Sequence, residues 1–231
     1  MADGDSTAST ALPATNLVVD FVKSSVGAKV IMAVTGFCLW AFIIIHLIGN
    51  LQIFQGADAI NHYGVFLREL AHGAALWVAR IGLIVCFALH IAFGIRLAAK
   101  NRAARPVAYR MKKRMRTSAA SMSMAVSGLL VLAFLFFHLA HTTWGLVLPE
   151  DFTTTNAVKF ANGDAAHDVY LMMVKGFSHP WLVAIYVAGQ IVLLSHLYHG
   201  TASLWQSIGW HHPTWSPPVS PKLTRHPPGR R

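Results

Sequence analysis

The stretch KVIMAVTGFCLWAFIIIHLIGN, residues 29–50, decides the fold of this chain. Apart from its two ends it is almost wholly apolar, and an α-helix rises about 1.5 Å per residue. A helix of this length crosses the roughly 30 Å of hydrocarbon in a lipid bilayer. The stretch therefore predicts a membrane-spanning helix that carries an ionisable side chain, His46, within it.

Three further apolar blocks of similar length follow. Hydrophobic residues make up 55% of the chain and charged residues 12%, whereas about a quarter of the residues in soluble domains are charged. The predicted spans are residues 28–54, 74–99, 118–140 and 180–209. The sequence predicts an all-α transmembrane helical bundle.

The segments outside the bundle are polar. Residues 1–27 form a polar N-terminal segment whose start does not resemble a cleavable secretory signal, so the first span is expected to stay in the membrane. Residues 210–231 form a proline-rich basic tail. Cys38 and Cys86 both lie inside spans, which argues against a disulfide framework and against a clustered zinc site.

The net charge of +10 has an uneven distribution. Lys and Arg gather in residues 96–116, in the C-terminal tail and near the start of the first span, whereas acidic residues dominate the other two loops. The positive-inside bias then predicts a cytoplasmic N-terminus, basic loop and C-terminus, in agreement with four crossings. Membrane topology accounts for the positive charge, and no nucleic-acid partner is expected.

Five histidines fall within the predicted spans: His46, His90, His138, His196 and His199. A single intramembrane histidine can be a hydrogen-bonded structural group, but as a set these are informative. His46 and His138 are expected toward the outer face, and His90 and His199 in the inner half. The two layers would lie on the order of 10 Å apart.

Two imidazoles that face each other across a bundle can hold a haem iron from both sides. Both axial positions are then filled, which favours electron transfer over oxygen chemistry. No Cys-x-x-Cys-His motif is present, so the haem would be non-covalent and of b type. Helical bundles commonly mount such cofactors from facing helices.

Four glycines are placed to support this interpretation. Gly36 and Gly128 precede the outer histidines by ten residues and are expected near the inner pair, and Gly82 and Gly189 are expected near the outer pair. Each helix would supply a ligand at one layer and room for a flat macrocycle at the other. The alternative is that small residues simply allow membrane helices to pack closely.

Four histidine contexts together resemble a known family, the single-polypeptide di-haem cytochrome b anchor of succinate dehydrogenase and fumarate reductase. They are IIHLIGNLQIF, ALHIAFGIRLAAKNRAARPVAY, FFHLAHTTWG and HLYHGTASLWQSIGW, and the resemblance covers residues 24–209. It implies that His90 and His199 ligate the inner (proximal) haem iron, and that His46 and His138 ligate the outer (distal) one.

The resemblance also implies a non-catalytic subunit of an enzyme of the tricarboxylic acid cycle in the cell (inner) membrane. A flavoprotein subunit would oxidise succinate, an iron-sulfur subunit would relay electrons, and the anchor would dock both and reduce or oxidise a membrane quinone. Residues 100–116 and the end of the fourth span are candidate docking surfaces, although basic residues there also serve as a topology signal beside anionic lipid. Arg80 and Arg96 either neutralise haem propionates or reach the interface.

The sequence departs from the family after residue 209, because the family usually has a fifth transmembrane helix. The tail has six of the ten prolines and no apolar run, so no lipid-exposed helix is expected there. All four expected ligands precede this departure.

Three other interpretations remain open. The chain could be the di-haem anchor of another dehydrogenase or a hydrogenase, an intramembrane metal-ion transporter, or a haem-free scaffold. A transporter for divalent ions usually mixes histidine with carboxylate, but all nine acidic residues lie outside the predicted spans. The quinone site is not identified, and residues 61–72 are expected to form an interfacial helix rather than part of an outer quinone pocket.

The segment LLSHLYHGTASLW, residues 193–205, contains two histidines at similar depth. Depth alone does not choose between His196 and His199. In the family the ligand lies six residues before the tryptophan equivalent to Trp205, and this match selects His199. His196 is then expected to be a neighbour of the inner haem, with a hydrogen-bonding role.

Overall fold

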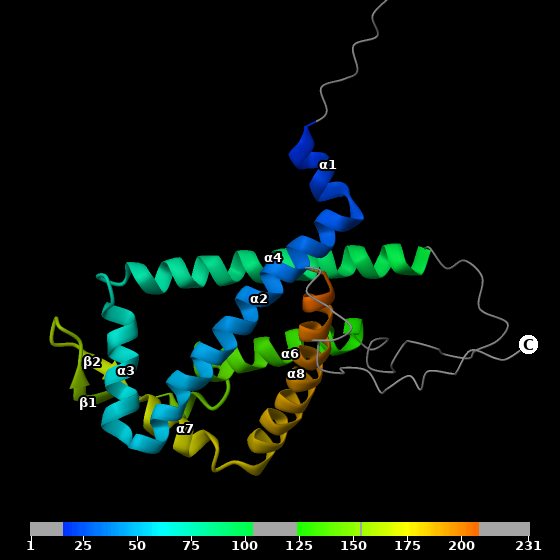
Figure 1. Ribbon diagram of the computed structural model, residues 1–231. Coiled ribbons are helices and arrows are strands. Elements are labelled where there is room, and N and C mark those ends of the chain that lie inside the picture. Colours follow the sequence, from blue (N-terminus) through cyan, green and yellow to red (C-terminus); the bar gives the residue numbers. More distant parts are fainter. Residues whose placement is uncertain (1–15, 104–123, 153, 208–231) are drawn as a thin grey trace, which may run out of the picture.

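The computed structural model describes residues 16–103, 124–152 and 154–207, and this part of the chain is mainly helical (Figure 1). Four helices are long and apolar enough to cross a membrane: α2 (Ser25–Asn50), α4 (Ala74–Ala103), α6 (Met124–Thr142) and α8 (Pro180–Ser207). The all-α prediction is confirmed, and the chain is a multi-pass membrane protein.

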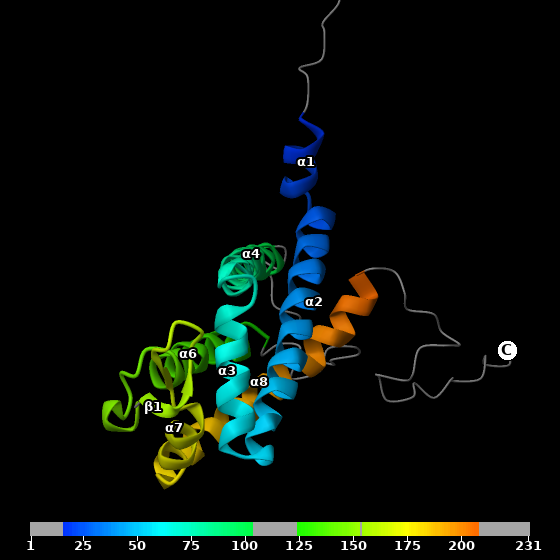
Figure 2. The ribbon, with the colours of Figure 1, turned by 90° about the vertical axis from the view of Figure 1, so that its left-hand side faces the viewer.

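The four helices form a crossed bundle. Helix α2 packs against α4 and α8, while α6 packs against α8 and α4. The helix pairs α2/α6 and α4/α8 therefore lie diagonally across the bundle. In Figure 2, α4 and α6 are strongly foreshortened while α2 is seen from the side, so the helices cross obliquely.

The predicted polar segment 1–27 contains an apolar helix, α1 (Leu17–Lys23), whose side chains Leu17, Val18 and Phe21 are exposed. Ser24 separates α1 from α2, because its backbone is extended and its hydroxyl accepts from the amide of Gly27 as an N-cap. This cap explains why the first spanning helix begins three residues earlier than the apolar pattern predicted. The end of the bundle that carries α1 is called the α1 end below.

Short elements cover the opposite end, called the α7 end below. They are η1 (Leu51–Gln55), α3 (Ala57–Glu69), η2 (Pro149–Asp151), β1 (Thr154–Lys159), β2 (Ala165–His167) and α7 (Val169–Gly176). Strands β1 and β2 pair antiparallel against α3. The helix expected within residues 61–72 is confirmed as α3, although it ends at Glu69.

Buried Asn61 joins two of these elements. Its side chain donates to Asp168 Oδ1 at 3.0 Å and accepts from the amide of Tyr170 at 3.1 Å. Asp168 also caps the start of α7. The covering elements at the α7 end are therefore held together by hydrogen bonds as well as by the small apolar cluster of Val65, Val158 and Ala166.

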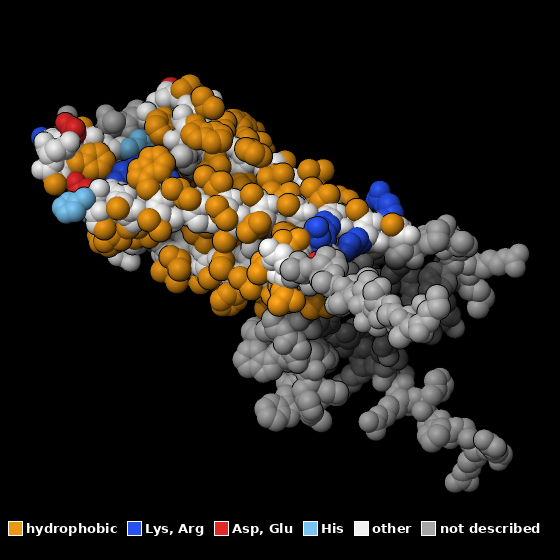
Figure 3. Space-filling view, turned by 90° about the horizontal axis from the view of Figure 1, so that it is seen from above, with side chains coloured by type: hydrophobic (Ala, Val, Ile, Leu, Met, Phe, Trp, Pro, Cys, Tyr) orange, Lys and Arg blue, Asp and Glu red, His pale blue; other side chains and the backbone are white. Residues whose placement is uncertain are grey.

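The surface of the spans is apolar. Figure 3 shows a broad hydrophobic band with Lys and Arg near one end and a mixture of acidic, basic and histidine side chains near the other. Large apolar side chains such as Ile45, Val78 and Leu194 are more than half exposed on this band. Such a surface suits lipid rather than water.

Several expectations fall wholly or partly on residues outside the described ranges. They are residues 1–15 of the N-terminal segment, the start of the third span at 118–123, the basic loop beyond residue 103, the end of the fourth span at 208–209 and the tail 210–231. Within the described ranges, span two extends to Ala103 and span three to Thr142, each slightly beyond the apolar block.

Candidate functional site

Two pairs of histidine rings meet inside the bundle. The rings of His46 on α2 and His138 on α6 have centroids 5.9 Å apart, and those of His90 on α4 and His196 on α8 are 6.5 Å apart. Each pair joins two helices that lie diagonally across the bundle. The first pair, near the α7 end, is called the outer pair, and the second, near the α1 end, the inner pair.

The ring separations fit one metal between each pair. A metal–imidazole bond is about 2 Å long, so two imidazoles on opposite sides of one metal have ring centres on the order of 6 Å apart. Within the described ranges, no group of three or more His, Cys, Asp and Glu side chains could hold a bare metal ion. A haem needs only two protein ligands, because its macrocycle supplies the other four, so the histidine pairs fit this cofactor.

Hydroxyl groups orient both rings of the inner pair. Thr35 Oγ1 lies 3.3 Å from His90 Nδ1, and Ser127 Oγ lies 3.1 Å from His196 Nδ1. Each hydroxyl donates its own proton to a backbone carbonyl of its helix, Thr35 to Ile31 and Ser127 to Met124. With its proton on the backbone carbonyl, each hydroxyl oxygen is free to accept from Nδ1–H of the histidine.

This hydrogen bonding favours the tautomer of the inner pair that carries its proton on Nδ1. With the proton on Nδ1, each Nε2 keeps its lone pair for a metal. Metal-binding histidines usually donate their second ring N–H in this way. The sequence analysis did not identify Thr35 or Ser127 as partners of the histidines.

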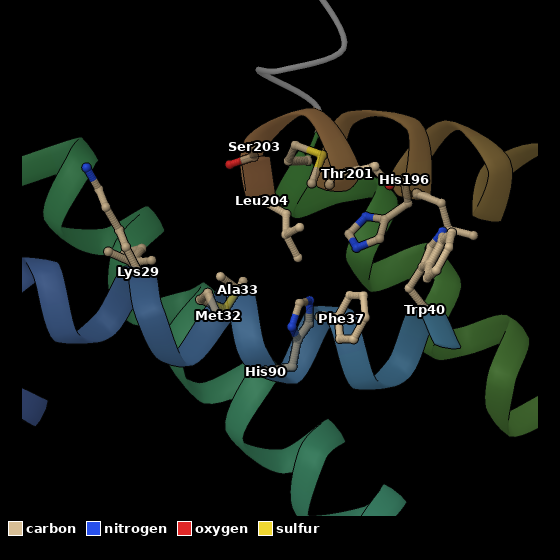
Figure 4. A pocket seen from close by; sticks show the side chains of 15 residues that line it. Lys29, Met32, Ala33, Phe37, Trp40, His90, His196, Thr201, Ser203 and Leu204 are labelled. Atoms are coloured by element: carbon tan, nitrogen blue, oxygen red, sulfur yellow. The ribbon is translucent and has the colours of Figure 1, made fainter. Parts of the chain in front are cut away.

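The inner pair borders a cavity of about 190 Å³ (Figure 4). His90 and His196 point into it from opposite sides, and Phe37, Trp40 and Leu204 also line it. Gly36 lies under the ring of His90 and Gly128 under that of His196; a Cβ at either glycine would come within 3.3 Å of the ring. The expected position of these two glycines at the inner layer is confirmed.

The structure places His196, and not His199, opposite His90. His199 lies three residues further along α8, and its ring is edge-on to that of Tyr198, with 5.1 Å between the ring centroids. The residues that line the cavity include His196 but not His199. The geometry thus favours His196, the opposite of the choice that the resemblance gave. The reason is the rotation of α8 about its axis, which turns residue 196 toward α4.

An internal repeat in the sequence points to the same residue. A hydroxyl residue and a glycine come eleven and ten positions before the outer histidine in both α2 (Thr35, Gly36) and α6 (Ser127, Gly128). In α4 a glycine follows His90 by four residues, and in α8 Gly200 follows His196 by four. Aligning the two hairpins therefore matches His90 with His196.

Aromatic side chains surround the outer pair. The ring of His46 stacks on Phe42 at 5.4 Å, and His138 Nδ1 lies 3.2 Å from the hydroxyl of Tyr186. Gly189 leaves room for Phe134 rather than for open space, since a Cβ there would clash with the Phe134 ring. Gly82 has no neighbour within 4 Å of its Cβ position. Of the two glycines expected at this layer, only Gly82 has open space beside it, whereas the space beside Gly189 is filled by the Phe134 ring.

The two intramembrane arginines have different neighbours. Arg96 donates to the backbone oxygens of Val22, at 2.7 Å, and Lys23, so it caps the last turn of α1. Arg80 lies over the ring of Trp77 at 5.1 Å. Burial lowers the pKa of the Arg68 guanidinium on α3, and the neighbouring charge of Arg80 lowers it further. Lys29 is the cation that lines the inner cavity.

No family model matches this chain, no curated protein matches it in sequence, and no solved structure matches its fold. The geometry of the two histidine pairs is therefore the basis for inferring what the protein does.

Proposed function

We propose that this protein is the membrane-anchoring cytochrome b subunit of a succinate dehydrogenase and holds two b haems, each between two histidines. His46 and His138 hold the outer haem, and His90 and His196 hold the inner one. The observation that carries the proposal is the pairing of intramembrane histidines from diagonal helices at ring separations that suit one iron. Bis-histidine haem iron carries single electrons without an open position for oxygen.

In this proposal the protein's side chains bind the haems and orient the histidine ligands. Nε2 of each histidine would be the ligand atom, while Thr35, Ser127 and Tyr186 contact the Nδ1 atoms of His90, His196 and His138. Gly36 and Gly128 keep the helix surface flat beside the inner rings. Lys29, which lines the inner cavity, would supply a positive charge for haem propionates. Arg96 is engaged elsewhere, because it donates to the backbone oxygens of Val22 and Lys23.

The two layers lie at different depths. Gly36 contacts His90 and precedes the outer ligand His46 on the same helix by ten residues, or about 15 Å along the axis. Gly128 and His138 have the same spacing on α6. Electrons would pass between an iron-sulfur subunit at the cytoplasmic α1 end and a membrane quinone, and the flavoprotein subunit would carry out the succinate chemistry.

The proposed orientation of the protein in the membrane rests on the distribution of charged side chains. The α1 end carries Lys23, Lys29, Arg96 and Lys100, whereas the α7 end carries most of the acidic side chains of the described ranges. By the positive-inside bias, this distribution supports a cytoplasmic α1 end. The soluble subunits are expected to dock there.

The direct test is a redox difference spectrum of the purified full chain, produced with ample haem, together with haem extraction. We expect two b haems per chain. The exposed α3 histidine provides a matched control, since His62→Ala should retain both. A protein reconstituted with haem that binds none contradicts the proposal.

A partner experiment separates this function from that of other di-haem anchors. Succinate is expected to reduce the haems only when the flavoprotein and iron-sulfur subunits are present. Reduction by succinate with the anchor alone contradicts the division of labour. Copurification with a hydrogenase or another dehydrogenase, in place of these subunits, identifies a different member of the same class.

Replacing Thr35 by valine tests the hydroxyl contact to His90. The change keeps the side-chain shape but removes the acceptor of Nδ1–H, and losing such a contact typically weakens metal binding about 10-fold to 100-fold. We expect weaker retention of the inner haem in a haem-transfer assay and an unchanged outer haem. Thr142→Val is the control, because Thr142 makes the same type of backbone bond, to the carbonyl of His138. Equal retention of the inner haem in the two variants argues against a role for the Thr35–His90 contact in haem binding.

A further inference from the structure

His141 is a buried histidine at the end of α6, one turn beyond the proposed ligand His138. The residue is 1% exposed, and its ring lies edge-on to that of Phe177 with 6.3 Å between the centroids. The last residue of α7, Gly176, packs closely on the ring, since a Cβ there would lie 2.8 Å from Nε2. Burial of a polar ring is unfavourable unless hydrogen bonds compensate for the lost water. The partner of His141 therefore indicates what this side chain does.

The hydroxyl of Tyr186 on α8 connects His141 to His138. Its oxygen lies 2.8 Å from His141 Nδ1 and 3.2 Å from His138 Nδ1. If His138 binds iron through Nε2, its Nδ1–H donates to the tyrosine oxygen, and the single hydroxyl proton is free to donate to His141 Nδ1. The three side chains then form a hydrogen-bond chain that runs from the outer haem ligand to His141.

Aromatic rings hold Tyr186 in this position. The rings of Phe134, Phe137 and Phe177 lie edge-on to it, with centroids 5.5, 6.0 and 4.8 Å away. Edge-on contacts of this kind add to the stability of a packed ring. Phe134 also fits into the space beside Gly189, one turn along α8, where a Cβ would clash with it. The tyrosine is thus packed from α6 and from the turn before α8, with its hydroxyl between the two histidines.

The hydroxyl contacts of the inner pair end differently. Thr35 and Ser127 donate their protons to backbone carbonyls of their own helices, at 2.7 and 3.1 Å. At the inner site the chain therefore ends on the helix backbone, whereas at the outer site it ends on a side chain, His141. That side chain can affect the bond between Tyr186 and His138 without ligating the iron, because hydrogen bonds in a chain polarise one another.

We propose that His141, acting through the hydroxyl of Tyr186, is a positioning residue for His138 and lowers the midpoint potential of the outer haem. This inference rests on the proposed haem site. A histidine ligand that donates its Nδ1–H becomes a stronger electron donor to the metal. Extra electron density at the iron stabilises its oxidised form, and hydrogen bonding beyond the ligands is one of the factors that set haem potentials. Acceptance of the tyrosine proton by His141 strengthens this effect.

Tyr186→Phe in the full-length haem-loaded protein is the first test, with potentiometric titration as the measurement. The change keeps the packed ring and removes the acceptor of His138 Nδ1–H. We expect the outer haem to become easier to reduce by about 10-fold, the lower end of the effects of such partners, which is about 59 mV for a one-electron couple. The inner haem potential should not change. Phe137→Leu is the control for a lost ring contact to Tyr186 and should leave both potentials unchanged.

Two changes at His141 separate its hydrogen bond from its packing. His141→Asn places an amide oxygen near the position of Nδ1, so it can still accept from Tyr186, and the outer haem potential should stay close to that of the unmodified protein. His141→Leu removes the acceptor, and the potential should rise by part of the Tyr186→Phe shift. Equal potentials in the two His141 variants overturn the inference, because the proposed effect depends on an acceptor at this position.

Nitrogen-15 spectra of the full chain with labelled histidines give a readout that needs no haem. The rings of His138 and His141 should be opposite tautomers at Nδ1, because the one proton of Tyr186 can be donated to only one of them. Tyr186→Phe should shift both signals, which are assigned by difference from His138→Ala and His141→Asn. The same tautomer in both rings, or an outer haem potential unchanged in Tyr186→Phe, overturns the inference. A protein that binds no haem overturns the proposed function instead, so the two failures are distinguishable.

Discussion

Replacing His138 by alanine is expected to lower the haem content from two to one per chain, with loss of the outer haem. The ring of His138 faces His46 at 5.9 Å and is oriented by the hydroxyl of Tyr186. Alanine removes the iron ligand on α6 and leaves an iron with one protein bond, which cannot bridge α2 and α6. His46→Ala should have the same effect because it removes the other half of the same pair.

The measurement is haem extraction combined with difference spectra recorded at separate potentials, which distinguish the two haems. The inner haem should keep its spectrum, since the glycines that contact His90 and His196 lie ten residues from the outer ligands along α2 and α6. His62→Ala is the control for loss of a histidine as such. Retention of both haems in His46→Ala and His138→Ala would remove the outer pair from the proposed site.

Replacing His196 by alanine is expected to abolish the inner haem, while His199→Ala should leave it bound with at most a shifted potential. His196 faces His90 at 6.5 Å and rests beside Gly128, and Ser127 holds its Nδ1. Residue 199 is displaced from residue 196 by about 60° around the helix and about 4.5 Å along it. The ring of His199 instead lies edge-on to Tyr198, and His199 does not line the inner cavity.

Ser127→Ala sharpens this comparison. Loss of the Ser127 hydroxyl should weaken binding of the inner haem only if His196 is the ligand. The expected loss of affinity is about 10-fold to 100-fold, as for other contacts of this kind. The reverse pattern, in which His199→Ala removes the inner haem and both His196→Ala and Ser127→Ala retain it, supports the ligand implied by the family resemblance. Haem content per chain decides between these outcomes.

The sequence predicted the four spans and the depth of their histidines because both are local properties. Hydropathy selects the spanning segments, and a fixed rise per residue converts sequence position into depth. For this reason the pairing of His46 with His138, and the presence of Gly36 and Gly128 at the inner layer, agree with the structure. Span ends were less predictable, since Ser24 starts α2 through a side-chain cap that hydropathy does not detect.

Only the tertiary structure decided which side chains face one another. The rotation of α8 selects His196 over His199, and the crossing of distant helices brings Thr35 to His90 and Tyr186 to both His138 and His141. The same folding places Asp151, from a loop, against the end of the bundle. These relations depend on the sum of many contacts between remote segments, whereas depth depends on one helix at a time.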